Sequence, residues 1–186
     1  MLIDDPKSVV AEAYRVLRTN LQFSAVDKPL KKVLVTSSVP QEGKSMVIAN
    51  LAISIASTGN KTLLVDADLR RPKQHKNYLL ENHIGLSNFL AENLPLDTVI
   101  NPTKVDTLHV ITSGPVPPNP AEILGSERMN KFIEEVSSIY DTVLFDTPPV
   151  NSVADASILS SRMDGVILVV EAGSTEREAV IIAKQQ

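Results

Sequence analysis

The residues whose types and spacing most clearly point to a chemical function lie in SSVPQEGKS, residues 37–45. Its end, Gly43-Lys44-Ser45, matches the end of the phosphate-binding loop GxxxxGKS/T. In such a loop backbone N–H groups surround phosphate oxygens, Lys44 reaches the β- and γ-phosphates, and the Ser45 hydroxyl binds Mg²⁺. Ser38 replaces the usual first glycine, which is acceptable if that position does not require a positive φ. The alternative is a plain strand-to-helix turn with an exposed lysine.

Three aspartates follow two further apolar stretches. Asp66 and Asp68 end LLVDAD, and Asp146 ends VLFD. Residues two apart in an extended chain point the same way, so the first two carboxylates are expected to face one crevice. Asp146 corresponds to the carboxylate that positions Mg²⁺ in phosphate-loop NTPases. The alternatives are an acidic turn paired with Arg70 and Arg71, and a helix-capping aspartate. The coincidence of three such features favours nucleotide binding.

Composition narrows the function classes. The 186-residue chain has a formal net charge of −4 and 4% aromatic residues, so it lacks the basic footprint and the stacking residues of a nucleic-acid-binding protein. It has no cysteine, which excludes disulfides and thiolate ligands. No apolar run is long enough to cross a bilayer. No stretch reads NKxD, so guanine recognition has no support, and ATP with Mg²⁺ is the expected cofactor pair.

Five apolar runs must provide the strands that position these residues. They are VLVTS (33–37), TLLVD (62–66), LHVIT (108–112), TVLFD (142–146) and GVILVVE (165–171). Runs that are apolar throughout and alternate with helical patterns are typical of parallel strands covered on both faces by helices. Ligands of such sheets bind at the carboxyl ends of the strands, where the loop and the aspartates lie. The sequence predicts one α/β domain over residues 1–186, with a parallel β-sheet flanked by helices.

Helical patterns fill the connections between these runs. Asp5 and Pro6 look like an N-cap and a first helical residue, which predicts a helix over residues 6–24. Residues 175–178 look like a capping box that opens a last helix. No strand follows that helix to return to the sheet, so we expect the natural protein to continue beyond Gln186. Two further helices are predicted after the loop, up to Gly59, and from Ser126 to Tyr140.

The motifs together resemble a known family, the bacterial tyrosine kinases of the capsular and exopolysaccharide type, whose fold is that of MinD-like P-loop ATPases with three layers. The resemblance covers nearly the whole chain and is carried by EAYRVLRTN (12–20), SSVPQEGKS (37–45), LLVDADLRRP (63–72), SGPVPPNPAEILGSER (113–128) and DTPPVNSVADA (146–156). It implies an ATP-dependent, autophosphorylating protein tyrosine kinase that regulates polysaccharide synthesis and export. Two features depart from the family pattern. Gln41 stands where the family loop commonly has glycine, and the three tyrosines form no C-terminal cluster.

The resemblance also assigns roles at the site. Lys44 neutralises charge on the transferred phosphate, Ser45 binds Mg²⁺, and Asp68 and Asp146 hold the metal directly or through water. Asp66 is left to orient or deprotonate the acceptor tyrosine, because a phenol with a pKa near 10 is a weak nucleophile at neutral pH. Arg70 is expected to stabilise developing phosphoryl charge or, equally, to pair with the neighbouring aspartates. The nucleotide-binding loop is expected to comprise Ser38, Val39, Pro40, Gln41, Glu42, Gly43, Lys44, Ser45 and Met46.

Partners are likewise implied by the resemblance. The kinase is expected in the cytoplasm, recruited to the inner face of the membrane by the cytoplasmic tail of a membrane chain-length regulator, and opposed by a cognate phosphotyrosine phosphatase. Glu12, Arg15 and Arg18 form ExxRxxR, which in such kinases joins subunits into a homo-oligomeric ring that presents tyrosine-rich tails to neighbouring active sites. The alternative for these charges is a solvated helix face with weak pairing.

Two rival functions share the same fold. A MinD/ParA-like ATPase switch without kinase activity normally carries a lysine just after the first loop glycine, where this chain has Val39. A regulatory module that binds nucleotide without catalysis would require a lost ligand, and none of the expected ligands is lost. His75, His83 and His109 are scattered and are interpreted as surface or packing residues.

Overall fold

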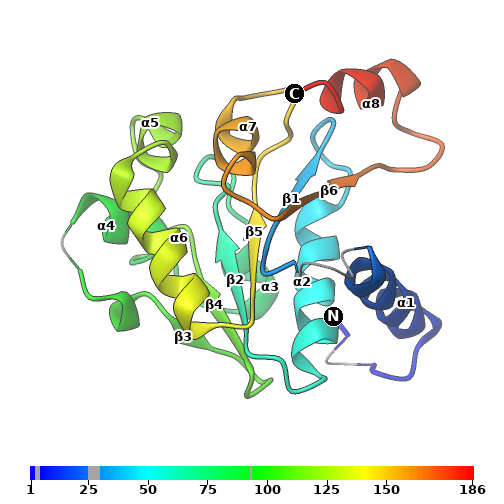
Figure 1. Cartoon of the computed structure of the whole chain (residues 1–186), viewed down its shortest axis with the longest axis horizontal. Helices are drawn as coiled ribbons and strands as arrows, with labels where there is room; N and C mark the ends of the chain where they lie inside the picture. The colour runs from blue at the N-terminus through cyan, green and yellow to red at the C-terminus, as the bar shows by residue number, and fades with distance from the viewer. Residues whose placement is uncertain (3–4, 25–29, 93) are drawn as a thin grey trace.

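One sheet of six strands organises the protein. The structure is a computed structural model that describes residues 1–2, 5–24, 30–92 and 94–186. The strand order is β3-β4-β2-β5-β1-β6 (Figure 1). In chain order the strands are β1 (Lys32–Ser37), β2 (Thr62–Asp66), β3 (Asn101–Pro102), β4 (Leu108–Ile111), β5 (Thr142–Asp146) and β6 (Gly165–Val169).

The pairing of the strands confirms the predicted fold class with one correction. All five predicted strands are present and pair in parallel, but the short edge strand β3 runs antiparallel to β4. No sequence pattern indicates β3, because a two-residue strand has no periodicity and one of its residues is Pro102, which an edge position tolerates. In the centre of the sheet β5 lies between β1 and β2, and Asp146 is in register with both Val35 and Asp66.

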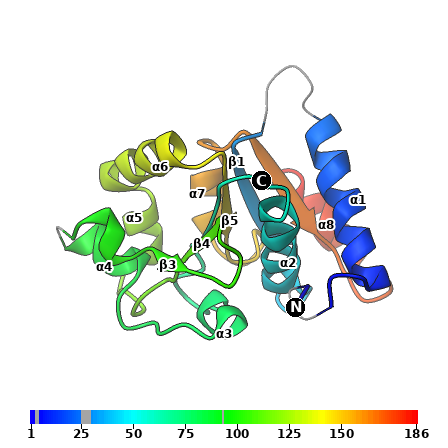
Figure 2. The ribbon, with the colours of Figure 1, turned by 90° about the horizontal axis from the view of Figure 1, so that it is seen from below.

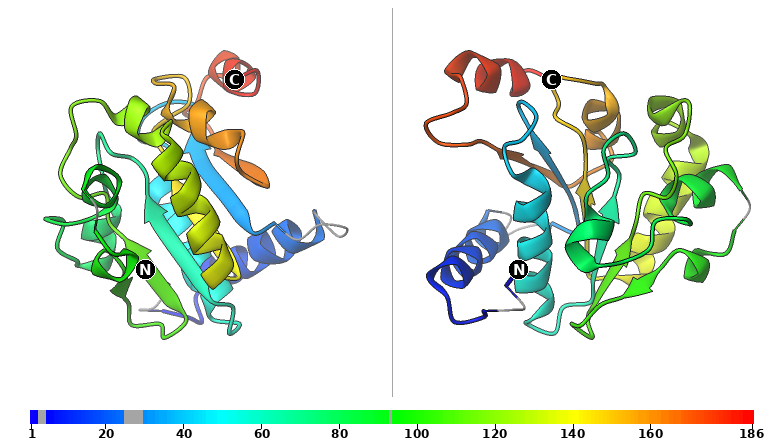
Figure 3. Two further views of the ribbon diagram at one scale, coloured as in Figure 1. Left: turned by 60° about the vertical axis from the view of Figure 1, so that its left-hand side comes forward. Right: turned by 180° about the vertical axis from the view of Figure 1, so that it is seen from behind.

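Helices cover both faces of the sheet, which gives the predicted three layers (Figure 2). On one face lie α1 (Val9–Phe23) and α2 (Lys44–Ala56), with the short α3 (Gln74–Tyr78) beside α2. The longest helix on the other face is α6 (Glu127–Ile139), as two further views show (Figure 3). The remaining helices are α4 (Leu86–Ala91), the 3₁₀ turn η1 (Leu96–Thr98), α5 (Pro120–Leu124), α7 (Asp155–Ser160) and α8 (Arg177–Ala183).

The core consists of two hydrophobic layers, one on each side of the sheet. Successive strand residues point to opposite faces, so a strand that is apolar throughout serves both layers. On the α2 side lie Val33, Val35, Leu64, Val110 and Leu144. On the α6 side lie Leu34, Leu63, Val65, Val143 and Phe145. This double burial is the physical reason why the strands lack the polar alternation of a half-exposed sheet.

The first helix begins later than predicted. Its N-cap is Ser8, whose hydroxyl accepts a hydrogen bond from the Ala11 N–H at 3.2 Å, and Asp5 and Pro6 lie in the turn before it. Serine caps a helix about as well as aspartate does, so capping preference alone does not distinguish a start at Asp5 from a start at Ser8. The predicted end at residue 24 is close to the observed last residue, Phe23.

The capping box predicted for α8 is wrong. The helix begins at Arg177 with Glu176 as its N-cap, and no side chain caps it. Instead, the Thr175 hydroxyl donates a hydrogen bond to Glu42 in the phosphate-binding loop and accepts one from the Glu171 N–H. The Thr175 hydroxyl, which the local pattern assigned to the N-terminus of the helix, therefore makes a long-range contact instead. By contrast, the cap predicted at Ser126 is confirmed, since its hydroxyl accepts from the Met129 N–H.

Candidate active site

The loop from β1 to α2 contains two residues in the left-handed region. Gly43 has φ +79° and is the N-cap of α2, and Gln41 has φ +73°. An L-residue is strained at such a φ, whereas glycine adopts it freely, so Gln41 stands at a position that favours glycine. Ser38 is not among the residues with positive φ, so the loss of the first glycine is tolerated. The first N–H groups of a helix have no carbonyl partner within it, so those of Lys44 and Ser45 are the candidates to bind an anion, whereas the Met46 N–H donates to the Gly43 carbonyl at 3.0 Å.

Glu42 stabilises this loop through hydrogen bonds on the side that faces the protein interior. Its buried carboxylate accepts hydrogen bonds from the Ser38 hydroxyl at 2.9 Å, from the Val39 N–H at 2.8 Å and from the Thr175 hydroxyl. Burial alone would raise the pKa of Glu42, but these hydrogen bonds outweigh it and lower the pKa. The loop is thereby tied to the segment that precedes α8. The sequence predicted that Glu42 and Ser38 contact the nucleotide. In the structure both are buried and hydrogen-bonded to each other beneath the loop.

Lys44 lies between the metal-binding candidates. Its ammonium is 3.0 Å from Asp68 Oδ2 and 3.2 Å from Asp146 Oδ1. Burial opposes the charge on the lysine, but Asp146 and Asp68 outweigh that effect and raise the pKa of Lys44. For Asp146 complete burial dominates and raises its pKa, although Lys44 acts in the opposite direction. The strand ends of β1, β2 and β5 thus converge on one cluster of charges, as the sequence predicted.

Asp66 occupies a different environment from Asp68. The two were expected to face the same crevice, but β2 ends at Asp66 and the Ala67 N–H donates to the Val65 carbonyl at 3.1 Å, so the strand's alternation does not extend to Asp68. Asp66 is fully buried, and its Oδ2 accepts hydrogen bonds from the backbone N–H groups of Lys73 at 3.1 Å and Gln74 at 2.9 Å. Its Oδ1 has no hydrogen-bond partner among the described residues. Burial and then the charge of Asp146 raise the pKa of Asp66 well above its usual value.

Arg70 is engaged by an aspartate that sequence reasoning did not consider. Its guanidinium donates two hydrogen bonds of 2.9 Å to Asp155, from Nε to Oδ2 and from Nη2 to Oδ1. Asp155 is fully buried in the first turn of α7, 85 residues away along the chain. The predicted pairing of Arg70 with its neighbouring aspartates is therefore wrong. Its bidentate contact connects the turn after β2 to α7.

A cavity of about 400 Å³ lies over this cluster. Its size is within the usual range for a small-molecule site. Several predicted loop residues and Asp68 line it, whereas Ser38, Val39, Glu42, Asp66, Arg70 and the fully buried Asp146 do not. Three polar residues that were not predicted also line it: Arg71, Lys73 and Asn77. The full lining is Pro40, Gln41, Gly43, Lys44, Ser45, Met46, Asp68, Arg71, Lys73, Asn77 and Pro149.

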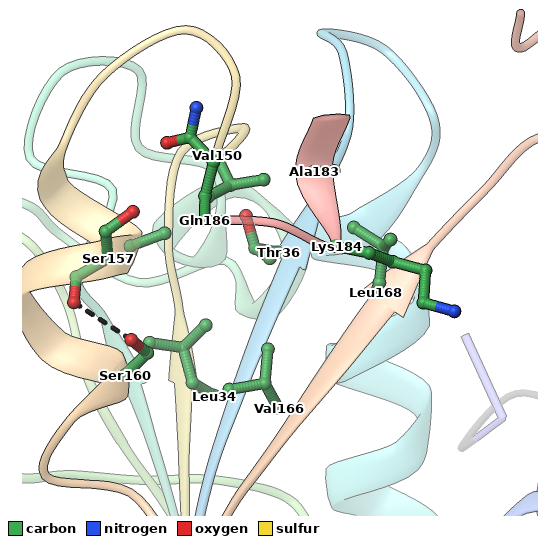
Figure 4. Close-up of a pocket in the computed structure, with 11 residues that line it drawn as sticks. Leu34, Thr36, Val150, Ser157, Ser160, Val166, Leu168, Ala183, Lys184 and Gln186 are labelled. Atoms are coloured by element: carbon green, nitrogen blue, oxygen red, sulfur yellow. Dashed lines mark hydrogen bonds between the residues drawn. The ribbon is translucent and has the colours of Figure 1, made fainter. Parts of the chain in front are cut away.

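A second cavity of about 410 Å³ lies elsewhere, between β1, β6, α7 and the end of the chain (Figure 4). Its walls are mainly apolar, with Leu34, Val166 and Leu168 on the strands. Ser157 and Ser160 lie on its α7 side, where the Ser160 hydroxyl donates to the Ser157 carbonyl. None of the predicted site residues lines it, so the convergent charges belong to the first cavity alone.

The donor set suits magnesium bound together with a nucleotide. Asp68 and Asp146 supply carboxylate oxygens, and Ser45 supplies a hydroxyl next to Lys44 Nζ, 3.3 Å away. Magnesium is commonly held by one or two carboxylates together with substrate phosphates and waters. Within residues 1–2, 5–24, 30–92 and 94–186, no group of three or more His, Cys, Asp or Glu residues would hold a metal by itself. The residues therefore fit a metal that binds with the nucleotide.

Comparison with known proteins decides between the functions that share this fold. A family model described as an AAA domain matches residues 31–180. The tyrosine-protein kinase YwqD of Bacillus subtilis is 46% identical over 181 residues, which cover 97% of this chain and 76% of that protein. The chain belongs to the bacterial tyrosine-protein kinase family. The family, fold and enzyme class predicted from the sequence are confirmed, and an ATPase switch without kinase activity is not favoured.

Solved structures agree with this membership. The kinase domain of the Escherichia coli tyrosine kinase ETK superposes with a TM-score of 0.95 at 36% identity, covering 99% of this chain and 72% of that one. The septum site-determining protein MinD of Pyrococcus horikoshii, complexed with Mg-ADP, superposes with a TM-score of 0.63 at 23% identity, covering 75% of this chain and 57% of that one. The second likeness shows the fold alone. Among the described residues no helix is both long and apolar enough to span a bilayer.

Proposed function

We propose that this kinase-family chain binds Mg·ATP in the cavity above α2 and transfers the γ-phosphoryl group to a tyrosine hydroxyl on another polypeptide. The observation that carries the proposal is the convergence of Lys44, Asp68 and Asp146 from three neighbouring elements within 3.2 Å. Two of the chain's own tyrosines are engaged, since Tyr78 donates to the Ala49 carbonyl and Tyr140 contacts His109. Neither hydroxyl is available as an acceptor in this conformation.

The reaction follows from the groups at the site. The phenolic oxygen of the acceptor forms a bond to the γ-phosphorus, and the bond to the oxygen that bridges the β- and γ-phosphates breaks. ADP leaves, and the phenolic proton passes to a base. Lys44 and the N–H groups at the start of α2 stabilise negative charge on the phosphate oxygens. Ser45, together with Asp68 and Asp146 directly or through water, would hold Mg²⁺, which would neutralise charge on the phosphates.

Asp66 is proposed to orient or deprotonate the acceptor tyrosine. Among the described residues, its Oδ1 is the one carboxylate oxygen of the cluster that is buried without a hydrogen-bond partner, so it has a lone pair to offer. Asp66 is fully buried and does not line the cavity, so an acceptor tyrosine reaches it only when the side chains that cover it move aside. Asp66→Asn is expected to slow transfer to tyrosine more than it weakens Mg·ATP binding. Calorimetric titration checks this, and a variant unable to bind Mg·ATP would assign Asp66 to metal binding or to support of the site.

Arg70 has little support as a phosphate-binding group. Reaching the cavity would require it to leave Asp155, a fully buried carboxylate that would then be unpaired. Arg71 is better placed, because it lines the cavity and its side chain is exposed. We therefore propose Arg71 as the guanidinium that contacts phosphate oxygens. Sequence reasoning named the first arginine of the pair, since spacing alone does not show which one a turn directs inward.

Assembly is proposed to use the ExxRxxR face of α1. Arg15 pairs with Glu12 at 2.6 Å within the chain, and both side chains are exposed enough to exchange partners. Arg18 instead donates to the Ser54 carbonyl of α2 at 2.7 Å, so it also anchors α1 to its own domain. A ring of copies through this face would be a head-to-tail interface with complementary charges on different surfaces. Arg15→Glu is therefore a cleaner test than reversal of both arginines, and light scattering should show the loss of any oligomer while ATP binding persists.

The cellular role is proposed from family membership. The kinase acts in the cytoplasm, at the inner face of the membrane, where the cytoplasmic tail of a membrane chain-length regulator activates it. It phosphorylates tyrosine-rich tails of neighbouring copies, a phosphotyrosine phosphatase reverses the modification, and the cycle regulates capsular or exopolysaccharide synthesis. Incubation of the protein with γ-labelled ATP and a tyrosine-rich peptide tests the catalytic part. Phosphotyrosine supports the kinase, ADP release alone would indicate an ATPase switch, and neither product would indicate a regulatory module.

A further inference from the structure

Gln74 is a fully buried amide at the centre of the site for which the catalytic proposal has no role. It is the first residue of α3, and its backbone N–H donates to Asp66 Oδ2. Its side chain lies among residues from three elements. Nε2 donates to Asp146 Oδ2 at 2.7 Å and to the Ser45 carbonyl at 3.0 Å, and Oε1 accepts from Asn77 Nδ2 at 3.1 Å. Each polar atom of the amide therefore has a partner.

These contacts fix the orientation of the Asp146 carboxylate. Oδ2 is held by Gln74, and Oδ1 faces the Lys44 ammonium at the cavity. A carboxylate rotates freely about its terminal bond unless both oxygens have partners, because that torsion is broad. Without Gln74 the rotation of Asp146 would be limited only from the cavity side. The amide thus selects the oxygen that faces Lys44.

The same amide joins the two chain segments that supply the metal-binding groups. Through Nε2 it links the Ser45 carbonyl, in the first turn of α2, to Asp146 at the end of β5. Asn77 supports this link by donating to both the Ser45 carbonyl at 3.3 Å and Gln74 Oε1. Groups that hold metal ligands in place from behind contribute strongly to metal affinity.

We propose that Gln74 is a positioning residue for magnesium, which sets the distance and orientation between the Ser45 hydroxyl and the Asp146 carboxylate. The inference rests on the proposed function, in which those two groups bind the metal with the nucleotide. Gln74 itself touches neither metal nor nucleotide, since it lies behind the lining of the cavity. Its loss should weaken binding of the metal–nucleotide complex and leave metal-free nucleotide binding unchanged.

Calorimetric titration with ADP, once with Mg²⁺ and once with EDTA, tests the inference in the full chain. Gln74→Met keeps the side-chain length and removes both donors. Mg·ADP affinity should fall at least about tenfold, while the affinity for ADP in EDTA stays within about twofold. Gln74→Glu keeps the shape but turns an acceptor towards Asp146, so its loss of Mg·ADP affinity should be larger. Gln22→Met, the same change at an exposed position of α1, should alter neither affinity.

Each outcome has a defined meaning. Equal losses with Mg²⁺ and with EDTA, or unchanged Mg·ADP affinity, would overturn the role of Gln74. If Gln74→Met does not fold by circular dichroism, Gln74→Glu carries the test, because it keeps the side-chain volume. The wild-type protein separates this inference from the proposed function. If Mg²⁺ gives the wild type no gain in ADP affinity, then the metal site itself is wrong, whatever the variants do.

Discussion

The strained loop residue Gln41 provides a quantitative test of the site's geometry. At φ +73° an L-residue is disfavoured by about 1–2 kcal/mol, whereas glycine adopts this conformation freely. Glycine also increases the entropy of the unfolded chain, which offsets about 0.4–1 kcal/mol of the gain. With the midpoints of these ranges, about 1.5 and about 0.7 kcal/mol, Gln41→Gly should therefore stabilise the nucleotide-free protein by roughly 0.8 kcal/mol. For a chain of 186 residues this corresponds to a rise of about 1–4 °C in the unfolding temperature.

Thermal unfolding followed by circular dichroism measures this change, and two matched variants isolate its cause. Gln41→Ala removes the side chain but keeps the strain, so its unfolding temperature should stay within about 1 °C of wild type. Gly43→Ala adds a Cβ at φ +79° where no atom lies within 4 Å, so only backbone strain should lower its stability, by about 1 kcal/mol. The reasoning is refuted if Gln41→Gly destabilises the protein, or if Gln41→Ala stabilises it equally.

Two further predictions concern stability, and both use denaturation in the absence of nucleotide. The lowered pKa of Glu42 means that its carboxylate stabilises the fold above its unfolded value of 4.5 and that this contribution is lost as the pH falls through the lower folded value. Glu42→Gln should therefore show a shallower loss of unfolding temperature than wild type between about pH 5 and pH 3, and an identical pH dependence would contradict the assignment. Arg70→Leu leaves the buried carboxylate of Asp155 unpaired and should cost about 2–3 kcal/mol in urea unfolding. Adding Asp155→Asn to Arg70→Leu should recover part of that loss, and no recovery would show that the pair is not its cause.

The strands and the phosphate-binding loop were predictable because their signals are local. Strands buried on both faces must be apolar at every position, and the sequence shows this directly in all five runs that became parallel strands. Gly43-Lys44-Ser45 is contiguous, so no folding is needed to recognise it. The departure from the family's glycine at Gln41 marked this position, but the left-handed conformation of Gln41 was not predicted.

The supporting contacts were not predictable, because their partners are far apart in the sequence. Gln74 meets Asp146 across 72 residues, and Arg70 meets Asp155 across 85. No periodicity or motif marks such pairs, which only the sheet order brings together. The prediction that Asp66 and Asp68 face one crevice failed for a different reason. Side chains two apart point the same way only within a strand, and β2 ends at Asp66.

Phosphotransfer by Lys44→Met tests the central claim most directly. The ammonium of Lys44 is positioned to stabilise charge that develops on the transferred phosphoryl group, and loss of one such group costs on the order of a hundredfold in rate. Wild-type and variant proteins are incubated with γ-labelled ATP, Mg²⁺ and a tyrosine-rich peptide, after circular dichroism confirms equal folding. The account predicts phosphotyrosine from the wild type and less than about a tenth of that rate from Lys44→Met. A variant that retains more than this, or a wild type that releases ADP without labelling tyrosine, would contradict it.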